Sequence, residues 1–415
     1  MRALTRYLLQ FRPLVILALV AWLAGGLYIF HGLNIEAYPD PSPPLVEVIT
    51  QNPAWSAEEM ERQITVPEET TLFGIPHIQY IRSISVFGLS DVKLYFDYDS
   101  EYLWDRQEVL NRLQLVTLPQ NLTPQLSPWS PIGEIYRYKL EGNGYSLNEL
   151  KATQDWFVTR ELKQVPGIID ITTFGGTTKQ YQAEIDPRKL LQYGVPLPQV
   201  VNAVTASNAN AGGNYLTYGS QSVNVRGLGL LRNLEDMRNI VLASRNGVPI
   251  FLGDVGDVHE GYQPRLGLVG ADAQNDVVEG IVLLQRGEKS LPALAALRVK
   301  VNQLNNGLLP HGIHIVPIYD RTDLINVTTG TVRHVVLMGL ILVTTVLLLF
   351  LGNIRLSLIT ALAIPCSLLF AFALMVSTGV SANLISIGAI DFGILVDAAI
   401  IVLERIHRRL QTIRP

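Results

Sequence analysis

Cysteine and charged side chains are scarce in this chain of 415 residues. Its single cysteine, Cys366, cannot form an internal disulfide, so the fold relies on packing alone. Charged residues make up 16% of the sequence, whereas typical soluble domains carry ~25%. The net charge of −4 comes without a basic patch, and we therefore predict no nucleic-acid partner.

The sequence also lacks the motifs of ATP-driven and hydrolytic machinery. No phosphate loop of the G-x-x-x-x-G-K-[ST] kind occurs, so ATP is not expected to drive the protein. Serine and histidine residues are scattered and form no pairing of a nucleophile with a base. We predict neither an enzyme nor a bound cofactor.

A basic leader precedes the first apolar segment. Residues 1–12 carry Arg2, Arg6 and Arg12, and residues 13–30 are almost entirely apolar. A cleaved signal peptide would begin in this way, but the apolar run is long and no small-x-small cleavage site directly follows it. We interpret residues 13–30 as an uncleaved transmembrane anchor whose arginine-rich end lies in the cytoplasm.

Three more apolar segments occupy the C-terminal part of the chain. Each is close to the ~20 residues that cross the core of a bilayer. The predicted second, third and fourth transmembrane helices cover residues 333–351, 356–377 and 384–404. Since a basic cytoplasmic end at 405–415 would follow, the distribution of arginines predicts four spans with both termini in the cytoplasm.

The last of these apolar segments contains acidic residues. Asp391 and Asp397 lie inside the run, and Glu404 lies at its end. Each aspartate would cost about 2.5–3.5 kcal/mol near the bilayer centre, so it requires a partner or a function. On an α-helix Asp397 and Glu404 share one face, which makes the three acids a candidate proton relay. Two alternatives stay open, namely a buried helix of a soluble protein and structural ion pairs with basic residues on other helices.

The long region between the first and second apolar segments contains no further span, so we expect it on the far side of the membrane. After a proline-rich linker, its hydrophobic patterns predict strands at 45–51, 81–87 and 91–98 and helices at 56–72 and 101–116. Ser56 with Glu59 forms a helix-capping pattern. These elements define a first β-α-β subdomain at 31–132.

A similar order of elements begins again further along the chain. Strands are expected at 135–140, 168–173, 276–285 and 314–319, and helices at 146–164, capped by Ser146 with Glu149, and 291–304. The repetition predicts a second α+β subdomain of the same type, built from 133–181 and 271–332. Between its two parts the chain is rich in Gly, Asn and Gln, and residues 206–218 are expected to form a protruding loop or hairpin.

Several of these segments together resemble a known family. The matching stretches are Asp391-Phe-Gly-x-x-Val-Asp397 followed by Glu404, and the segments 252–258, 279–288 and 319–324. The chain resembles the N-terminal half of a resistance-nodulation-division (RND) efflux pump, in particular its heavy-metal branch, exemplified by cobalt-zinc-cadmium pumps. Multidrug members carry two adjacent acids on this helix, whereas here Ala398 follows Asp397.

The resemblance implies a fold, an activity and partners. The fold is a membrane α-helical bundle of four spans plus an α+β periplasmic porter domain of repeated β-α-β subdomains, with a docking subdomain at 182–270. The activity is export of metal cations, leaning toward divalent ions, in exchange for protons across the bacterial inner membrane. The expected partners are two further copies in a homotrimer, a periplasmic adaptor, an outer-membrane channel and the missing C-terminal half. The docking loop would present Asn208, Asn210, Gly212, Gly213 and Tyr215 to a neighbouring subunit.

Metal ligands stay unassigned in this part of the chain. The five methionines do not cluster, so a thioether site for Cu(I) is not supported. The glycines of segment 252–258 indicate a turn, and we predict a solvated loop rather than a ligand set for Asp254, Asp257, His259 and Glu260. A multidrug permease and a nonfunctional truncated fragment of such a pump are the alternatives to a metal pump.

Overall fold

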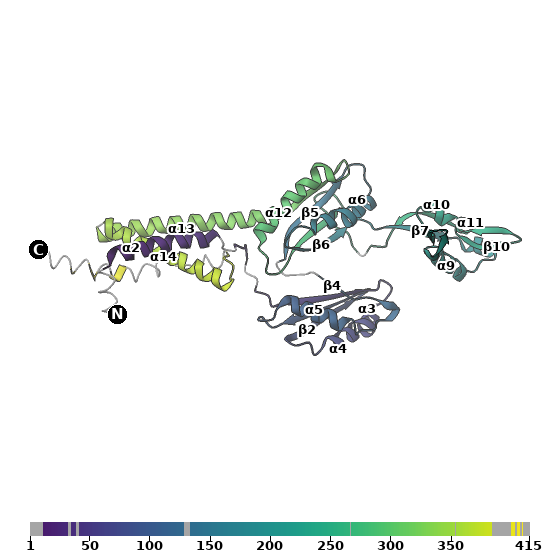
Figure 1. Cartoon of the computed structure of the whole chain (residues 1–415), viewed down its shortest axis with the longest axis horizontal. Helices are drawn as coiled ribbons and strands as arrows, with labels where there is room; N and C mark the ends of the chain where they lie inside the picture. The colour runs from purple at the N-terminus through teal and green to yellow at the C-terminus, as the bar shows by residue number, and fades with distance from the viewer. Residues whose placement is uncertain are drawn as a thin grey trace.

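The computed structural model shows an elongated molecule with a bundle of helices at one end and α/β units beyond it (Figure 1). It describes residues 11–31, 35–38, 41–127, 133–265, 267–352, 354–383, 400–402, 405–406 and 409. The bundle contains helices α2 (Arg12–His31), α13 (Arg321–Leu351) and α14 (Ile354–Thr378). Helix α13 runs without a break from the α/β part into the bundle, so it links the two parts directly (Figure 1).

Close contacts hold α2 against α14. A Cβ atom on Gly26 of α2 would lie only 2.9 Å from the side chain of Leu369, so the absence of a side chain at Gly26 lets the two helices approach. The rings of Phe30 and Phe372 also meet, with centroids 5.4 Å apart. These contacts place the N-terminal helix alongside a helix that is far away in the sequence.

Two helices of the described chain are long and apolar enough to cross a membrane, at Pro13–Phe30 and Ser357–Thr378. They coincide with the first and third predicted spans. The second predicted span, 333–351, forms the C-terminal part of α13, where a shorter apolar stretch covers Leu337–Val346. The fourth, 384–404, lies outside the described residues except for the helical residues 400–402.

The first α/β unit is a four-stranded antiparallel sheet covered by helices. Its strands have the order β2-β3-β1-β4. They are β1 (Leu45–Gln51), β2 (Ile78–Val86), β3 (Leu89–Phe96) and β4 (Gln125–Ser127), with the 3-10 turn Pro119–Asn121 before β4. The covering helices are α3 (Ala57–Met60) and α4 (Val66–Leu72), joined by the π-helical turn Glu61–Thr65, and α5 (Tyr102–Leu113). Alternate residues of β3 point into the core, which includes Val92, Leu94 and Phe96.

The second α/β unit has a sheet with the strand order β14-β5-β13-β6, and its pairs are again antiparallel. Read from the β6 edge, with the strands of each unit ranked by their place in the sequence, this order is the same as in the first sheet. Its strands are β5 (Glu134–Gly142), β6 (Ile168–Gly175), β13 (Val278–Leu284) and β14 (Ile313–Asp320). Its helices are α6 (Leu147–Thr153), α7 (Thr159–Leu162) and α12 (Ser290–Gln303), with π-helical turns at Gln154–Val158 and Leu304–Leu308. The ring of Tyr138 on β5 crosses Gly280 on β13 so closely that a Cβ atom on Gly280 would overlap the ring.

The predicted helices with capping patterns are confirmed in both units. Ser56 accepts a hydrogen bond from the backbone N–H of Glu59, and the Glu59 carboxylate accepts from the N–H of Ser56. Ser146 and Glu149 form the same reciprocal pair. Such a box satisfies two N–H groups that a helix leaves unpaired, so the helix begins at these serines.

An insertion between β6 and β13 forms a separate unit at the far end of the molecule (Figure 1). A ribbon of β7 (Lys179–Ile185) and β12 (Gly256–Tyr262) connects it to the second sheet. Its other elements are α8 (Pro187–Tyr193), α9 (Leu197–Ala206), β8 (Ala211–Tyr218), β9 (Gln221–Gly227), α10 (Leu234–Arg238), β10 (Val241–Arg245), β11 (Val248–Phe251) and α11 (Leu252–Val255). It has a hydrophobic core of its own, which includes Val200, Leu252 and Val255.

The structure corrects the prediction of a solvated loop around residues 252–260. Residues Leu252–Val255 form the short helix α11, whose Asp254 carboxylate accepts a hydrogen bond from the N–H of Phe251. Residues Gly256–Tyr262 form β12, which pairs along its whole length with β7. The glycines indicated a turn, but Gly256 instead lets two strands approach, because a Cβ there would lie 2.6 Å from the carbonyl oxygen of Glu184.

The predicted protrusion within 206–218 is confirmed as part of a β-hairpin. Strands β8 and β9 pair with each other and with no other strand in the described chain. Every residue of both strands is exposed. An isolated two-stranded hairpin is marginal in water, so this one needs further contacts to be stable.

Candidate functional site

The predicted proton relay cannot be placed in the structure. Asp391, Asp397 and Glu404 all lie outside the described residues. The description of the preceding chain ends at Asn383, and Ala382 is fully buried against the bundle core that contains Ile364. The acids therefore remain a prediction from the sequence.

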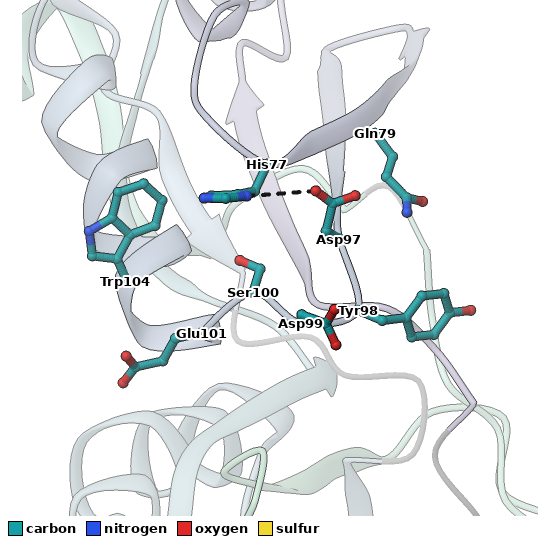
Figure 2. Close-up of a pocket in the computed structure, with 8 residues that line it drawn as sticks. All are labelled: His77, Gln79, Asp97, Tyr98, Asp99, Ser100, Glu101 and Trp104. Carbon is teal, nitrogen blue, oxygen red and sulfur yellow. Dashed lines mark ion pairs between the residues drawn. The ribbon is translucent and has the colours of Figure 1, made fainter.

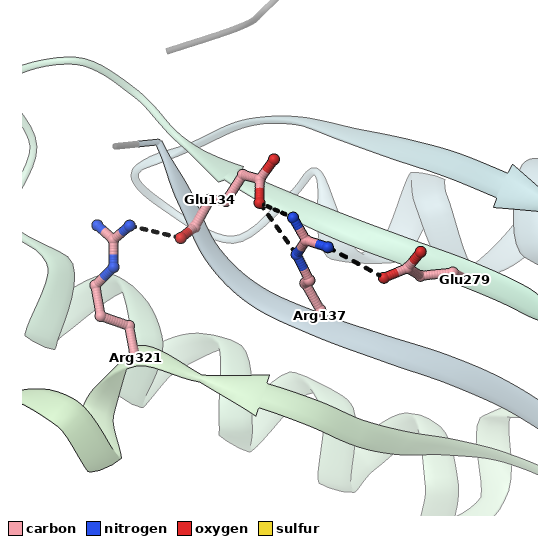
Figure 3. A network of polar contacts seen from close by, with 4 residues as sticks. All are labelled: Glu134, Arg137, Glu279 and Arg321. Carbon is pink, nitrogen blue, oxygen red and sulfur yellow. Dashed lines mark hydrogen bonds and ion pairs between the residues drawn. The ribbon is translucent and has the colours of Figure 1, made fainter. Parts of the chain in front are cut away.

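A chain of charged side chains connects the second sheet with the start of α13 (Figure 3). Arg137 on β5 donates to the carboxylate of Glu134 through Nε at 3.0 Å and through a second guanidinium nitrogen, and it also faces Glu279 on β13, with 3.8 Å between Nη1 and Oε1. Arg321, in the first turn of α13, donates to the backbone carbonyl of Glu134 at 2.6 Å and is only 8% exposed. The network fixes the helix that enters the bundle to the central strand β5.

The electrostatics of this network favour a structural role. Burial raises the pKa of Glu279, although the positive charge of Arg137 opposes the shift. The bond to Glu134 in turn raises the pKa of the Arg137 guanidinium. Since both carboxylates already face an arginine, a cation would have to displace Arg137 before it could bind here.

A polar cavity of about 580 Å³ lies on the first α/β unit, between β2, β3 and α5 (Figure 2). Its lining residues are His77, Gln79, Asp97, Tyr98, Asp99, Ser100, Glu101 and Trp104. His77 has the unusual φ angle of +66°, its Nδ1 lies 3.6 Å from Oδ2 of Asp97, and its ring meets Trp104 edge-on at 6.0 Å.

A buried aspartate lies beside this cavity. Asp105 is fully buried and accepts a hydrogen bond from Ser100. Burial raises the pKa of Asp105, and the bond from Ser100 opposes the shift. The acids of the cavity could attract cations, but no group of three or more His, Cys, Asp or Glu in the described part of the chain is arranged to hold a metal ion.

The segment 254–260 likewise forms no ligand set among the described residues. Nδ1 of His259 lies 3.3 Å from Oδ2 of Asp257, and its Nε2 lies 4.0 Å from Oε1 of Glu184. Glu260 pairs with Lys179 across the ribbon at 2.6 Å, and Asp254 caps α11. The contacts of His259 and Glu260 therefore link the two strands of the ribbon that carries the insertion, and Asp254 serves α11.

The structure separates the predicted docking residues into two groups. Asn208 and Asn210 accept hydrogen bonds from the N–H groups of Leu231 and Gly229, both at 3.1 Å, and so close the base of the hairpin. Gly212, Gly213 and Tyr215 lie on the exposed strand β8. Gly213 lets β9 approach, because a Cβ there would overlap the carbonyl of Val225, and Tyr215 is 62% exposed. Asn208 and Asn210 are exposed as well, so residues of both groups lie at the surface of the insertion.

Comparisons with known proteins agree with this architecture. A family model described as the AcrB/AcrD/AcrF family matches residues 4–414. The cobalt-zinc-cadmium resistance protein CzcA of Cupriavidus metallidurans is 38% identical over 97% of this chain and 39% of its own length. The cation efflux system protein CusA of Escherichia coli strain K12 is 35% identical over 96% of this chain and 39% of its own length. This chain therefore spans about two fifths of the length of these relatives.

A solved structure shows the same fold. The crystal structure of a heavy metal efflux pump in its crystal form II superimposes with a TM-score of 0.90 and 41% sequence identity, covering 99% of this chain and 43% of the other. The predicted resemblance to the heavy-metal branch of RND efflux permeases is confirmed by these similarities. The match over nearly the whole chain shows that it belongs to the AcrB/AcrD/AcrF family.

Proposed function

We propose that this chain is the N-terminal part of a proton-driven permease that exports divalent heavy-metal cations by proton antiport. The observation that carries the proposal is the 38% identity to a cobalt-zinc-cadmium resistance protein along 97% of the chain. The similarity to a solved heavy metal efflux pump supports it. The metal is the transported substrate, and the protein carries out no chemical reaction as an enzyme.

The proposed architecture has four spans in the bacterial inner membrane and a periplasmic porter domain. Two apolar helices support the membrane assignment. Nearly all side chains of α2 are exposed, as expected for a helix that contacts lipid. The corresponding strand orders of the two sheets support a pair of porter subdomains related as repeats. The insertion with its exposed hairpin serves as the docking subdomain of a homotrimer, which works with a periplasmic adaptor and an outer-membrane channel.

Proton coupling is assigned to Asp391, Asp397 and Glu404. Asp397 lies near the middle of the fourth predicted span, where burial in the membrane favours the neutral form of a carboxyl group. Asp391 provides a second site further out, and Glu404 lies toward the cytoplasmic end. Protons would enter from the periplasm, neutralise the acids in turn and leave inside, driving a metal cation outward.

Proteoliposomes that contain the full-length protein carrying this chain provide the test. Metal-dependent proton flux should be abolished by Asp397→Asn, strongly impaired by Asp391→Asn and slowed less by Glu404→Gln, while membrane insertion is retained. Leu395→Ala serves as the matched control, because it removes apolar packing near Asp397 without removing a titrating group. Wild-type flux in Asp397→Asn, or an equal loss in Leu395→Ala, would refute the role of this carboxyl group.

A further inference from the structure

Three segments that are distant in the sequence meet at Glu36. Its backbone N–H donates to the carbonyl oxygen of Ala382, beyond the end of α14, at 2.9 Å. Its neighbour Ile35 forms an isolated parallel bridge with the same residue. The Glu36 carboxylate bonds α12, because Oε1 accepts from the backbone N–H of Ser290 at 3.1 Å and Oε2 accepts from its Oγ at 2.6 Å. One residue thus joins the exits of two bundle helices to the beginning of α12.

The contact of Glu36 with Ser290 and Ala382 is buried, and its negative group lies at the positive end of a helix. Glu36 is only 7% exposed, and Ser290 and Ala382 are fully buried. A buried carboxylate is tolerated where hydrogen bonds satisfy its oxygens, and the positive end of the 14-residue helix α12 favours a negative group at this position. Removing the carboxylate would leave buried N–H and O–H donors without their acceptors, so both bonds of the contact depend on Glu36.

A second tie holds the neighbouring linker. Arg286, in the loop that leads into α12, donates to the backbone carbonyls of Ser42 at 2.7 Å and Pro43 at 3.2 Å. The linker that leaves the bundle is therefore bound to the loop that directly precedes Ser290, the first residue of α12. Leu294 and Leu297 of α12 are fully buried in the core of the second sheet, so a displacement of the start of α12 also displaces that sheet.

We propose that Glu36 is a positioning residue for transport, which couples movements of the helix bundle at Ala382 to α12 and the second sheet. Helix α13 is one continuous connection between the bundle and this sheet, held to β5 by Arg321. A single connection lets the sheet swivel, whereas the second attachment at Glu36 makes bundle and sheet move together. The inference rests on the proposed function, because it assigns a role within the transport cycle.

Ala382 is a suitable point for this coupling because of its place in the sequence. The predicted acid-bearing span begins at residue 384, directly after the last described residue of this segment. In the proposed transport cycle, a change in that predicted span would act on Ala382 and, through the bond from the N–H of Glu36, on α12. The Glu36 carboxylate itself faces the beginning of α12.

The test compares Glu36→Gln with a nearby control in the full-length protein carrying this chain. Zinc-dependent proton flux is measured in proteoliposomes over a range of zinc concentrations, and hydrogen exchange is followed over residues 290–293 and 380–383. Glu36→Gln should lower the maximal flux about tenfold without changing the half-saturating zinc concentration, because coupling is lost but binding is not. It should also raise hydrogen exchange at both segments. Glu288→Gln is the control, since Glu288 is exposed and lies near the same helix end, and it should behave as wild type.

A double variant separates coupling from a general loss of folding. Ser290→Ala alone should lower the maximal flux less than Glu36→Gln, and the two together should be no worse than Glu36→Gln alone, because both changes break one contact. Wild-type flux in Glu36→Gln, or additive losses in the double variant, would overturn the coupling role. Absence of zinc-dependent flux in the wild type would instead overturn the proposed function. The two failures can be distinguished, because hydrogen exchange reports on the Glu36 contact whether or not zinc is transported.

Discussion

Glu68 is a carboxylic acid in the core of the first α/β unit. It is fully buried on α4, where Oε1 accepts from the hydroxyl of Thr50 at 2.5 Å and Oε2 accepts from the hydroxyl of Ser90 at 3.5 Å. Burial raises the pKa of Glu68 from 4.5 to about 7, while the bonds from Thr50 and Ser90 oppose the shift and the charge of Glu69 adds to it. The folded unit therefore favours the protonated form.

This shift predicts a stability that falls as the pH rises. Between about 4.5 and about 7 the folded state binds more protons at Glu68 than the unfolded state does, so the contribution of Glu68 to the free energy of unfolding decreases across this window by about 3 kcal/mol and is constant above it. Glu68→Gln cannot lose a proton and should be more stable than wild type at pH 8, with no such advantage at pH 4. Thermal unfolding at both pH values measures the difference.

An exposed neighbour provides the control for this experiment. Glu61 lies on the same helical segment and is exposed to solvent, so Glu61→Gln should keep the pH dependence of the wild type. Parallel stability curves for wild type and Glu68→Gln would contradict the assignment to Glu68. Subtracting the unfolding temperature of the wild type from that of the variant in the same buffer cancels the contributions of all other titrating groups.

Residues that act through near neighbours were predictable, and residues that act across the fold were not. Ser56 and Ser146 were recognised as caps because their partners lie three residues ahead. Glu36 and Arg321 were missed, because their partners lie 254 and 187 positions away in the sequence. An acid a few residues after an apolar span was the signal in the sequence that could have indicated Glu36.

At the scale of elements, periodic hydrophobic patterns predicted strands and helices correctly where the local sequence determines the element. Strand β1 coincides with its predicted range 45–51, and β5, β6, β13 and β14 all overlap theirs. The three-residue strand β4 was missed, because its pairing with β1 rather than its own pattern makes it a strand. Strand β12 was mistaken for a loop for the same reason, since it depends on β7.

The hairpin of β8 and β9 carries a prediction at this scale. Tyr215, Leu216 and Val223 are 62%, 65% and 52% exposed, and burying a side chain of this kind in a neighbouring subunit would contribute about 1.5–3 kcal/mol. The triple change of these residues to serine should reduce the fraction of trimers captured by chemical crosslinking in detergent. Their loss should leave the insertion folded, because none of the three belongs to its core.

A matched change elsewhere on the insertion completes this test. Leu191 on α8 is 84% exposed, so Leu191→Ser removes a comparable apolar group away from the hairpin. It should leave the crosslinked fraction unchanged. A trimer fraction that survives the triple change would show that the hairpin does not hold the subunits together.

At the scale of the whole molecule, the proposed topology can be tested directly. From the basic residues near the predicted spans, we predict that both ends of the chain lie in the cytoplasm and the α/β units in the periplasm. An alkaline phosphatase fusion after Gly142, the last residue of β5, should be active, and a fusion after Pro415 should be inactive. A fluorescent protein, which matures in the cytoplasm, should give the opposite pattern, and cytoplasmic signal at Gly142 would refute the architecture.

The sequence by itself determined the division of the chain into apolar helices and α/β units, the capped helices and the family. These features depend on local hydrophobic periodicity, on short-range hydrogen bonds and on motifs that can be read along the chain. Only the tertiary structure decided that β12 completes a ribbon, that Arg321 ties α13 to β5, and that Glu36 meets Ser290 and Ala382. Such contacts depend on which distant surfaces are buried together, because a buried polar group must find its partner wherever packing places one.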